Sequence, residues 1–316
     1  MSVLRSLPIE AILKRGSITE ADVAGLRRAY NEHGALTGEE ADTLLIVNDV
    51  CVLQDSAWTD IFVEILSDYV VNQMQPEGYL TQANSIWLVS RISTDGRVGG
   101  RSELELLLAV VEKARWVPLS LVRFGLEQVK HAVAEGRGPL RFGEKLPAGT
   151  ITDKDVQVVR RLLMAFGAGN LAITAPEADA LFDINDASSA GTPNPGWAAL
   201  FVSAIANAAM AASGHAVPSR KEALSCTDLK SLDALKIGYR EQSIEERALA
   251  QLEQQRIEII TNELIAAAEP EALAERIDRN GGTTPNKYTL LLHLAQLGTR
   301  LDAALQTMLT RFHRAA

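Results

Sequence analysis

This 316-residue sequence contains few aromatic residues, cysteines and histidines. Aromatic residues make up 5%, and there are two cysteines and five histidines. The formal net charge is -9, so the chain repels phosphate and has little material for stacking on bases. We therefore expect no nucleic-acid partner. The hydrophobic share of 47% and the charged share of 22% are those of a globular protein that can bury a core.

Motifs for catalysis and for transition-metal binding are also lacking. The histidines form no HxxH or HExxH spacing and there is no CxxC pair, so zinc has no motif. There is no GxSxG nucleophile turn and no GxxxxGK[ST] phosphate loop. We therefore predict no catalytic residue and no tightly bound cofactor, although a weakly bound divalent metal stays open.

The cysteines and the N-terminus bear on location. Cys51 and Cys226 lie far apart, and the first residues, MSVLRSLP, lack the apolar run and cleavage site of a secretory signal. We expect a reducing, cytoplasmic location. The most apolar stretch, residues 196–214, approaches the roughly 20 residues that span a membrane, but it is rich in alanine and interrupted by Ser203 and Asn207. We expect it to be a buried helix rather than a membrane span.

An internal repeat organises the chain. Residues 16–23 (GSITEADV) recur as 149–156 (GTITDKDV), and residues 36–44 (LTGEEADTL) recur as 173–181 (ITAPEADAL). A later echo relates LVSRISTDG, which begins at Leu88, to a segment 185 residues further on, LAERIDRNG. Two copies of one structural unit are the simplest explanation.

The offset between the copies predicts the domain organisation. It grows from 139 residues at Trp58 and Trp197 to 185 at Leu88 and Leu273, so the second copy carries an insertion near 226–269. The divisions that we predict are an N-terminal segment 1–15, a first unit 16–136, a linker 137–148 rich in turn formers, and a second unit 149–316.

Apolar residues follow helical spacing in most segments, and few stretches alternate as strands do. The fold class that we predict is all-α. A short phrase, glycine–x–hydrophobe–threonine with an acidic or amide residue three positions later, precedes several of the helices and is typical of a capping box. Its occurrences begin at Gly16, Gly34, Gly78 and Gly149.

The glycine turns also have the spacing of the second half of an EF-hand calcium loop, but loops counted back from Gly34, Gly96 or Gly281 do not begin with aspartate. The segment ISTDGRVGGRSE, which ends at Glu103, resembles the tellurite-resistance TerB family, whose compact all-α domains have an aspartate–glycine turn before a glutamate that opens a helix. The resemblance implies Asp95 and Glu103 as candidate metal ligands. In the second copy Lys287 takes the place of the acid.

Acidic residues form two further patterns. Asp60, Glu64 and Asp68 recur every four residues and line one helical face, which we interpret as a solvated or partner-facing surface rather than a metal cluster. Pairs seven residues apart occur in both copies, and they indicate a polar network that braces a neighbouring helix, or a ligand site. These pairs are Asp42 with Asp49 and Asp179 with Asp186.

The insertion contains a strong helix candidate, residues 249–265, preceded by the capping box SIEE. Its apolar stripe is suited to one neighbouring helix, either in the body of the same chain or in a second copy that would form a homodimer. The residues of the stripe are Leu249, Leu252, Ile257, Ile260 and Leu264.

These patterns favour a non-catalytic interaction or scaffold protein that binds a protein partner, because repeated helical units offer binding faces without a recognised catalytic set. The first alternative is a divalent-metal-responsive sensor built on degenerate EF-hand-like or TerB-like turns. The second is an enzyme of unrecognised class.

Overall fold

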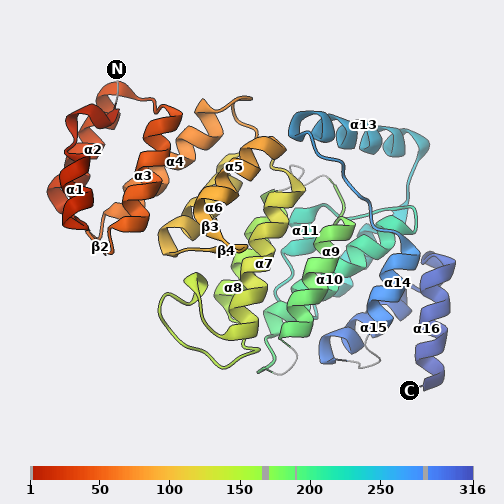
Figure 1. The fold of residues 1–316 in the computed structure, drawn as a ribbon. Coiled ribbons are helices and arrows are strands. Elements are labelled where there is room, and N and C mark those ends of the chain that lie inside the picture. Colours follow the sequence, from red (N-terminus) through yellow and green to blue (C-terminus); the bar gives the residue numbers. More distant parts are fainter. Residues whose placement is uncertain (1–2, 166–170, 189–190, 280–283, 316) are drawn as a thin grey trace. The chain divides into compact units, whose positions relative to one another are not determined.

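The computed structural model describes residues 3–165, 171–188, 191–279 and 284–315 (Figure 1). Contacts divide the chain into two compact units, Met1–Val117 and Pro118–Ala316. In the described residues helices make up nearly all of the regular structure, and each strand is two residues long. The predicted all-α class is therefore confirmed.

The first unit, as far as the structure describes it, is a bundle of short helices with four two-residue strands between them. Its elements are η1 (Val3–Ser6), α1 (Ile9–Arg15), β1 (Ser17–Ile18), α2 (Glu20–His33), α3 (Gly38–Val50), β2 (Leu53–Gln54), α4 (Trp58–Asp68), η2 (Tyr69–Gln73), α5 (Gln82–Ile92), β3 (Ser93–Thr94), β4 (Arg97–Val98) and α6 (Arg101–Lys113). Strand β1 pairs in parallel with β2, and β3 pairs antiparallel with β4.

The second unit is larger and is built around helix α10. Its elements are α7 (Leu119–Glu135), η3 (Pro139–Arg141), α8 (Asp153–Ala165), α9 (Ala175–Ala187), α10 (Pro195–Ala212), β5 (His215–Ala216), α11 (Arg220–Leu224), α12 (Leu232–Leu235), η5 (Lys236–Gly238), β6 (Arg240–Glu241), α13 (Ile244–Thr261), α14 (Pro270–Asp278), α15 (Pro285–Leu297), η6 (Gly298–Arg300) and α16 (Ala303–Ala315).

The compact units divide the chain earlier than the sequence repeat does. They meet at Val117 and Pro118, whereas the linker was expected at 137–148. The reason is that α7 packs against α8 and α9, so this helix belongs to the second compact unit. The expected linker folds back on the end of α7, where Leu146 N donates to Gly136 O at 2.8 Å. The repeat boundaries concern correspondence between sequences, and they remain a prediction.

Threonine capping boxes begin the helices where the glycine phrase predicts them. In α2 the Thr19 side chain accepts from Asp22 N while the Asp22 carboxylate accepts from Thr19 N, and α3 has the same arrangement. At α5 Thr81 accepts from the third helical amide. Each box satisfies amides that the first helical turn leaves without a partner, so the sequence fixes where these helices begin.

Among the described residues one helix, α10, is long and apolar enough to cross a membrane by length and composition, with a mean hydropathy of 1.4. Within the second unit 78% of it is buried, as expected of a core helix. Residues Trp197 to Met210 are all buried, and the many alanines let α8, α9 and α15 approach it closely. This helix carries the wall of the site described below.

Two side-chain interactions recur at corresponding places in the two units. Trp58 Nε1 donates to Asn48 Oδ1 at 2.9 Å, and Trp197 Nε1 donates to Asn185 Oδ1 at 3.3 Å. The ion pair of Arg91 with Asp42 has a counterpart in the weaker one of Arg276 with Asp179, at 2.8 and 3.7 Å. Each contact uses residues that the sequence alignment of the two copies brings into register, and the repeat itself stays a prediction.

We predict that Asn48→Leu and Asn185→Leu each lower the free energy of unfolding by about 1–3 kcal/mol, because each leaves a buried indole N–H without its acceptor. Urea unfolding followed by far-UV circular dichroism measures the loss. Asn31→Leu, at an exposed position of α2, is the control and should change stability little. A neutral Asn185→Leu beside a destabilising Asn48→Leu would argue against matched roles for the two tryptophans.

Candidate functional site

The two candidate metal ligands have different environments. Asp95 lies in the exposed turn between β3 and β4 with a φ of 52°. Glu103 is in the first turn of α6 and accepts a hydrogen bond from Asn48 Nδ2 at 2.6 Å. Burial, with the nearby charge of Asp49, raises the pKa of Glu103 above its usual value. Glu103 therefore joins α6 to α3, and the described residues contain no group of three or more His, Cys, Asp or Glu that could hold a metal ion.

The acidic stripe on α4 does not act as one cluster. Asp60 is exposed, and exposed Glu64 lies 3.8 Å from Arg27. Asp68 is half-buried and accepts from Tyr30 Oη at 2.6 Å and from Gln73 Nε2 at 2.7 Å. Burial raises the pKa of Asp68, but these hydrogen bonds outweigh it and hold the pKa below its usual value. Asp68 thus connects α4 to α2, and Asp60 and Glu64 stay on the surface.

The paired aspartates of the second unit belong to a polar network. Asp186 lies 2.9 Å from Lys287 and 3.2 Å from Arg276, both nearly buried. Arg276 also pairs with Asp183 at 2.6 Å and lies over the ring of Phe182. The network connects α9 to α14 and α15. Lys287 therefore serves to neutralise Asp186.

A cavity of about 620 Å³ lies in the second unit between α13 and the body of the unit. Helix α10 and the turn after it contribute small side chains, among them Ala208, Ala211 and Ala212. Segments 171–174 and 215–217 form further walls, and the segment after α13 contributes Ile265, Ala267 and Ala268. Alanine side chains leave this space open because a larger residue at the same backbone position would fill it. None of the candidate residues from sequence lines it.

Arg220 holds the wall of the cavity at residues 171–172. Its guanidinium makes a two-bond pair with the Glu177 carboxylate, at 2.6 and 2.7 Å, and both side chains are fully buried. It also donates to the carbonyl oxygens of Leu171 at 2.7 Å, Ala172 at 2.8 Å and Leu163 at 2.7 Å. A buried charge is tolerated when paired and fully hydrogen-bonded, so this geometry holds residues 171–172 against the end of α8 and the start of α9.

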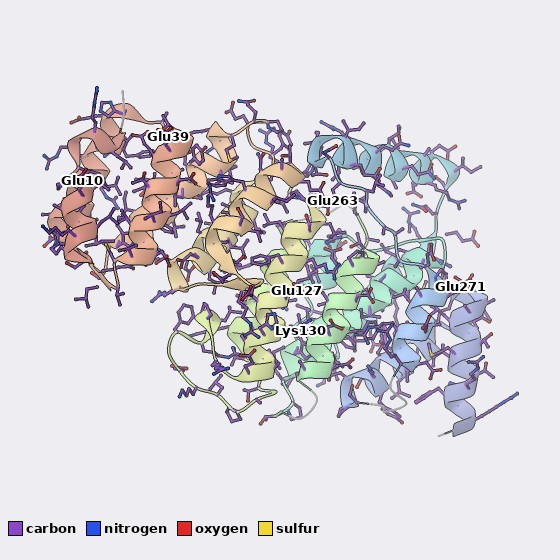
Figure 2. All side chains as sticks on the ribbon, viewed as in Figure 1. Glu10, Glu39, Glu127, Lys130, Glu263 and Glu271 are labelled. Atoms are coloured by element: carbon purple, nitrogen blue, oxygen red, sulfur yellow. The ribbon has the colours of Figure 1, made fainter. Side chains whose placement is uncertain are left out.

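Backbone and carboxylate contacts fix the opposite wall. Figure 2 shows Glu263 beneath α13, where both carboxylate oxygens accept from Ser120 N at the start of α7, at 3.1 and 3.2 Å. Ala175 N at the start of α9 donates to Ala266 O at 3.2 Å. Gln254 Nε2 donates to Ile265 O at 3.2 Å. The segment after α13 is thus held at the ends of two helices.

The two ends of the cavity differ in polarity. Strand β5 pairs with β6, which places His215 opposite Glu241, close to the beginning of α13. Glu246 and Arg247 line this end. The hydrogen bonds from Arg240 hold the pKa of Glu246 at about 2, so its negative charge is balanced by Arg240. Residues such as Ile265 line the other end, so the charged side chains lie at one end of the cavity and apolar ones at the other.

Helix α13 presents opposite faces to the cavity and to solvent. Arg247, Ala250 and Gln254 line the cavity, while Leu249, Leu252 and Ile259 are 65%, 61% and 80% exposed. Of the stripe predicted from sequence, Ile257 is buried and Leu264 is exposed. The stripe is therefore divided between two faces, because the helix touches the body through Ile257 and Thr261 and turns most of its large apolar residues outward.

No protein-family model, curated protein or solved structure matches the chain. The geometry of the site therefore carries the functional argument. Sequence reasoning missed the cavity because its walls come from segments as far apart as residues 171 and 268; the insertion near 226–269 was the one signal that pointed toward it.

We predict that Arg220→Met lowers the free energy of unfolding by about 3–5 kcal/mol, because Glu177 is left buried without its cation. Urea unfolding measures this. Arg220→Met/Glu177→Leu should be more stable than Arg220→Met alone, since no uncompensated charge remains. Arg240→Met, which breaks the exposed pair with Glu246, is the matched control with little expected change. If Arg220→Met and Arg240→Met lowered the free energy of unfolding equally, burial would not be what makes the Arg220–Glu177 pair important.

A second prediction concerns pH and His293 on α15. Burial, with the charge of Lys236 nearby, lowers the pKa of His293 from 6.5 to about 4, and its Nε2 has no hydrogen-bond partner among the described residues. The unfolded chain therefore binds this proton first as pH falls. Stability present above pH 6.5 is lost as pH falls toward 4, by about 3 kcal/mol.

His293→Leu should remove this acid-dependent loss, because the substituted side chain takes up no proton. Thermal unfolding of both proteins between pH 4 and pH 7 checks the prediction. An unchanged pH profile in His293→Leu would assign the acid sensitivity to other groups.

Proposed function

We propose that this chain is a non-catalytic helical interaction protein that pairs with a second copy of itself through the outward face of α13. The observation that carries the proposal is the exposure of large apolar side chains on that face, at Leu249, Leu252 and Ile259. A helix in water ordinarily buries such a stripe against a neighbour. No element in the described part of the second unit buries this apolar face, so a partner molecule is expected to bury it.

Charge argues against a lipid surface as that partner. The sequence of α13 contains four glutamates and two arginines, so the helix is acidic and would be repelled by anionic headgroups. A partner helix of mixed charge suits this surface better.

The spacing of the outward residues is self-complementary. Glu245, Leu249, Leu252 and Arg256 follow at intervals of four, three and four, so they lie on one face of the helix. A two-fold axis between Leu249 and Leu252 would set the two leucines of one copy against those of an antiparallel second copy. The same axis sets Arg256 opposite Glu245 of the second copy at both ends. Such an isologous contact closes into a dimer.

We predict a dimer for the full chain at tens of micromolar, measured by sedimentation equilibrium. Because one helix pair buries little surface, the association should be weak, and Leu252→Glu should make the chain monomeric. Arg256→Glu alone and Glu245→Arg alone should each weaken pairing about tenfold or more, since like charges then face each other.

The most specific test of the antiparallel pairing is a mixture of the two charge variants. An equimolar mixture of Arg256→Glu and Glu245→Arg should pair with each other, because every facing charge is then opposite in sign. Arg300→Glu, at an exposed position in η6, is the charge control and should leave the mass unchanged. A monomeric mass for the unaltered chain, or a mixture no better associated than its components, would overturn the proposal.

A further inference from the structure

The geometry points to the cavity beneath α13 as a binding site for a small amphipathic anion, a molecule with a carboxylate at one end and an apolar chain at the other. The inference concerns the inward face of α13 and does not depend on the pairing of its outward face. Its size of about 620 Å³ lies within the range of about 300–1,000 Å³ typical of small-molecule sites.

The charge of the cavity selects the sign of the ligand. Three titratable side chains line it, His215, Glu246 and Arg247. Arg240 donates two hydrogen bonds to the Glu246 carboxylate from outside the cavity and balances its charge. The Arg247 guanidinium is then the unbalanced charge of the lining, and it carries donors suited to a carboxylate. An anionic group at this end is favoured over a neutral or cationic one.

The remaining walls select an apolar chain. From Arg247 the lining follows the inward face of α13 through Ala250 to Gln254, a rise of about 10 Å. Across from it stand Ala208 and Ala211 of α10, and at the far end Ile265. The methyl and methylene groups of these alanines and of Ile265 gain free energy by covering a hydrocarbon chain.

The position of both walls is fixed before any ligand arrives. Arg220 orders residues 171–172 on one side, and Glu263 and Ala266 hold the segment after α13 on the other. A site that is already formed costs little ordering on binding. The glutamine amides of Gln242 and Gln251 also line the cavity and can donate to the anionic end.

The test is isothermal titration calorimetry of the full chain with octanoate, decanoate, decanol and decylammonium. Decanoate should bind most tightly, and about three- to fourfold more tightly than octanoate for each added methylene that enters the cavity. Decanol should bind more weakly and decylammonium most weakly, because each lacks the negative charge that Arg247 recognises.

Two variants locate the site. Arg247→Gln should weaken decanoate about tenfold or more while leaving decanol unchanged, since only the anion loses a charge-assisted contact. Ala211→Trp should abolish binding of both by filling the apolar end. Ala250→Leu is the alternative if Ala211→Trp does not fold. This substitution lies on exposed α13, so it narrows the cavity without changing the packing around α10.

Arg256→Gln is the matched control, because it removes the other arginine of α13 from the opposite face and should leave decanoate binding unchanged. Equal affinity for decanoate, decanol and decylammonium, no heat from any of them at millimolar concentration, or an equal effect of Arg247→Gln and Arg256→Gln would overturn the inference. Sedimentation of the Arg247→Gln variant tests ligand binding and helix pairing separately. The sedimenting mass of this variant should equal that of the unaltered chain, whether or not decanoate binds.

Discussion

The pairing of Arg220 with Glu177 is the constraint on which the second unit depends. Two charges that are both removed from water carry a large desolvation cost, which is offset only when their geometry is good and every donor finds an acceptor. Here the guanidinium reaches the carboxylate and the carbonyl oxygens of Leu163, Leu171 and Ala172. One side chain from α11 therefore ties the end of α8 and the start of α9 to residues 171–172. Residues 171–174 form one wall of the candidate cavity.

The first unit has a glutamate in the same kind of capping position. Glu40 occupies in α3 the capping position that Glu177 has in α9, and both belong to a threonine capping box. One oxygen of Glu40 accepts from Leu4 N at 2.9 Å, so this carboxylate contacts the backbone of η1. The capping role is thus common to both units, whereas the element bound by the second oxygen differs.

Helix α13 connects the two proposed activities of the molecule. Its short anchoring surface, Ile257 and Thr261, leaves both a small and polar face toward the cavity and a large apolar face toward solvent. Carboxylate contacts from Glu263 and backbone contacts from Ala266 hold the segment that follows it, in place of the apolar packing that holds α10. A helix held in this way can present two faces at once, one for a small ligand and one for a second copy.

The sequence by itself determined the all-α class, the starts of several helices and the burial of α10, because periodicity, capping boxes and an apolar composition act over a few neighbouring residues. It did not indicate that the candidate ligand Glu103 would bond to Asn48, that the compact units would divide at Val117, or that the apolar stripe of α13 would be divided between two faces. Only the tertiary structure decided these three features, because each one depends on which distant segments of the chain come into contact. The Arg220 side chain is another example, since it has five N–H donors and the fold determines which acceptors they reach.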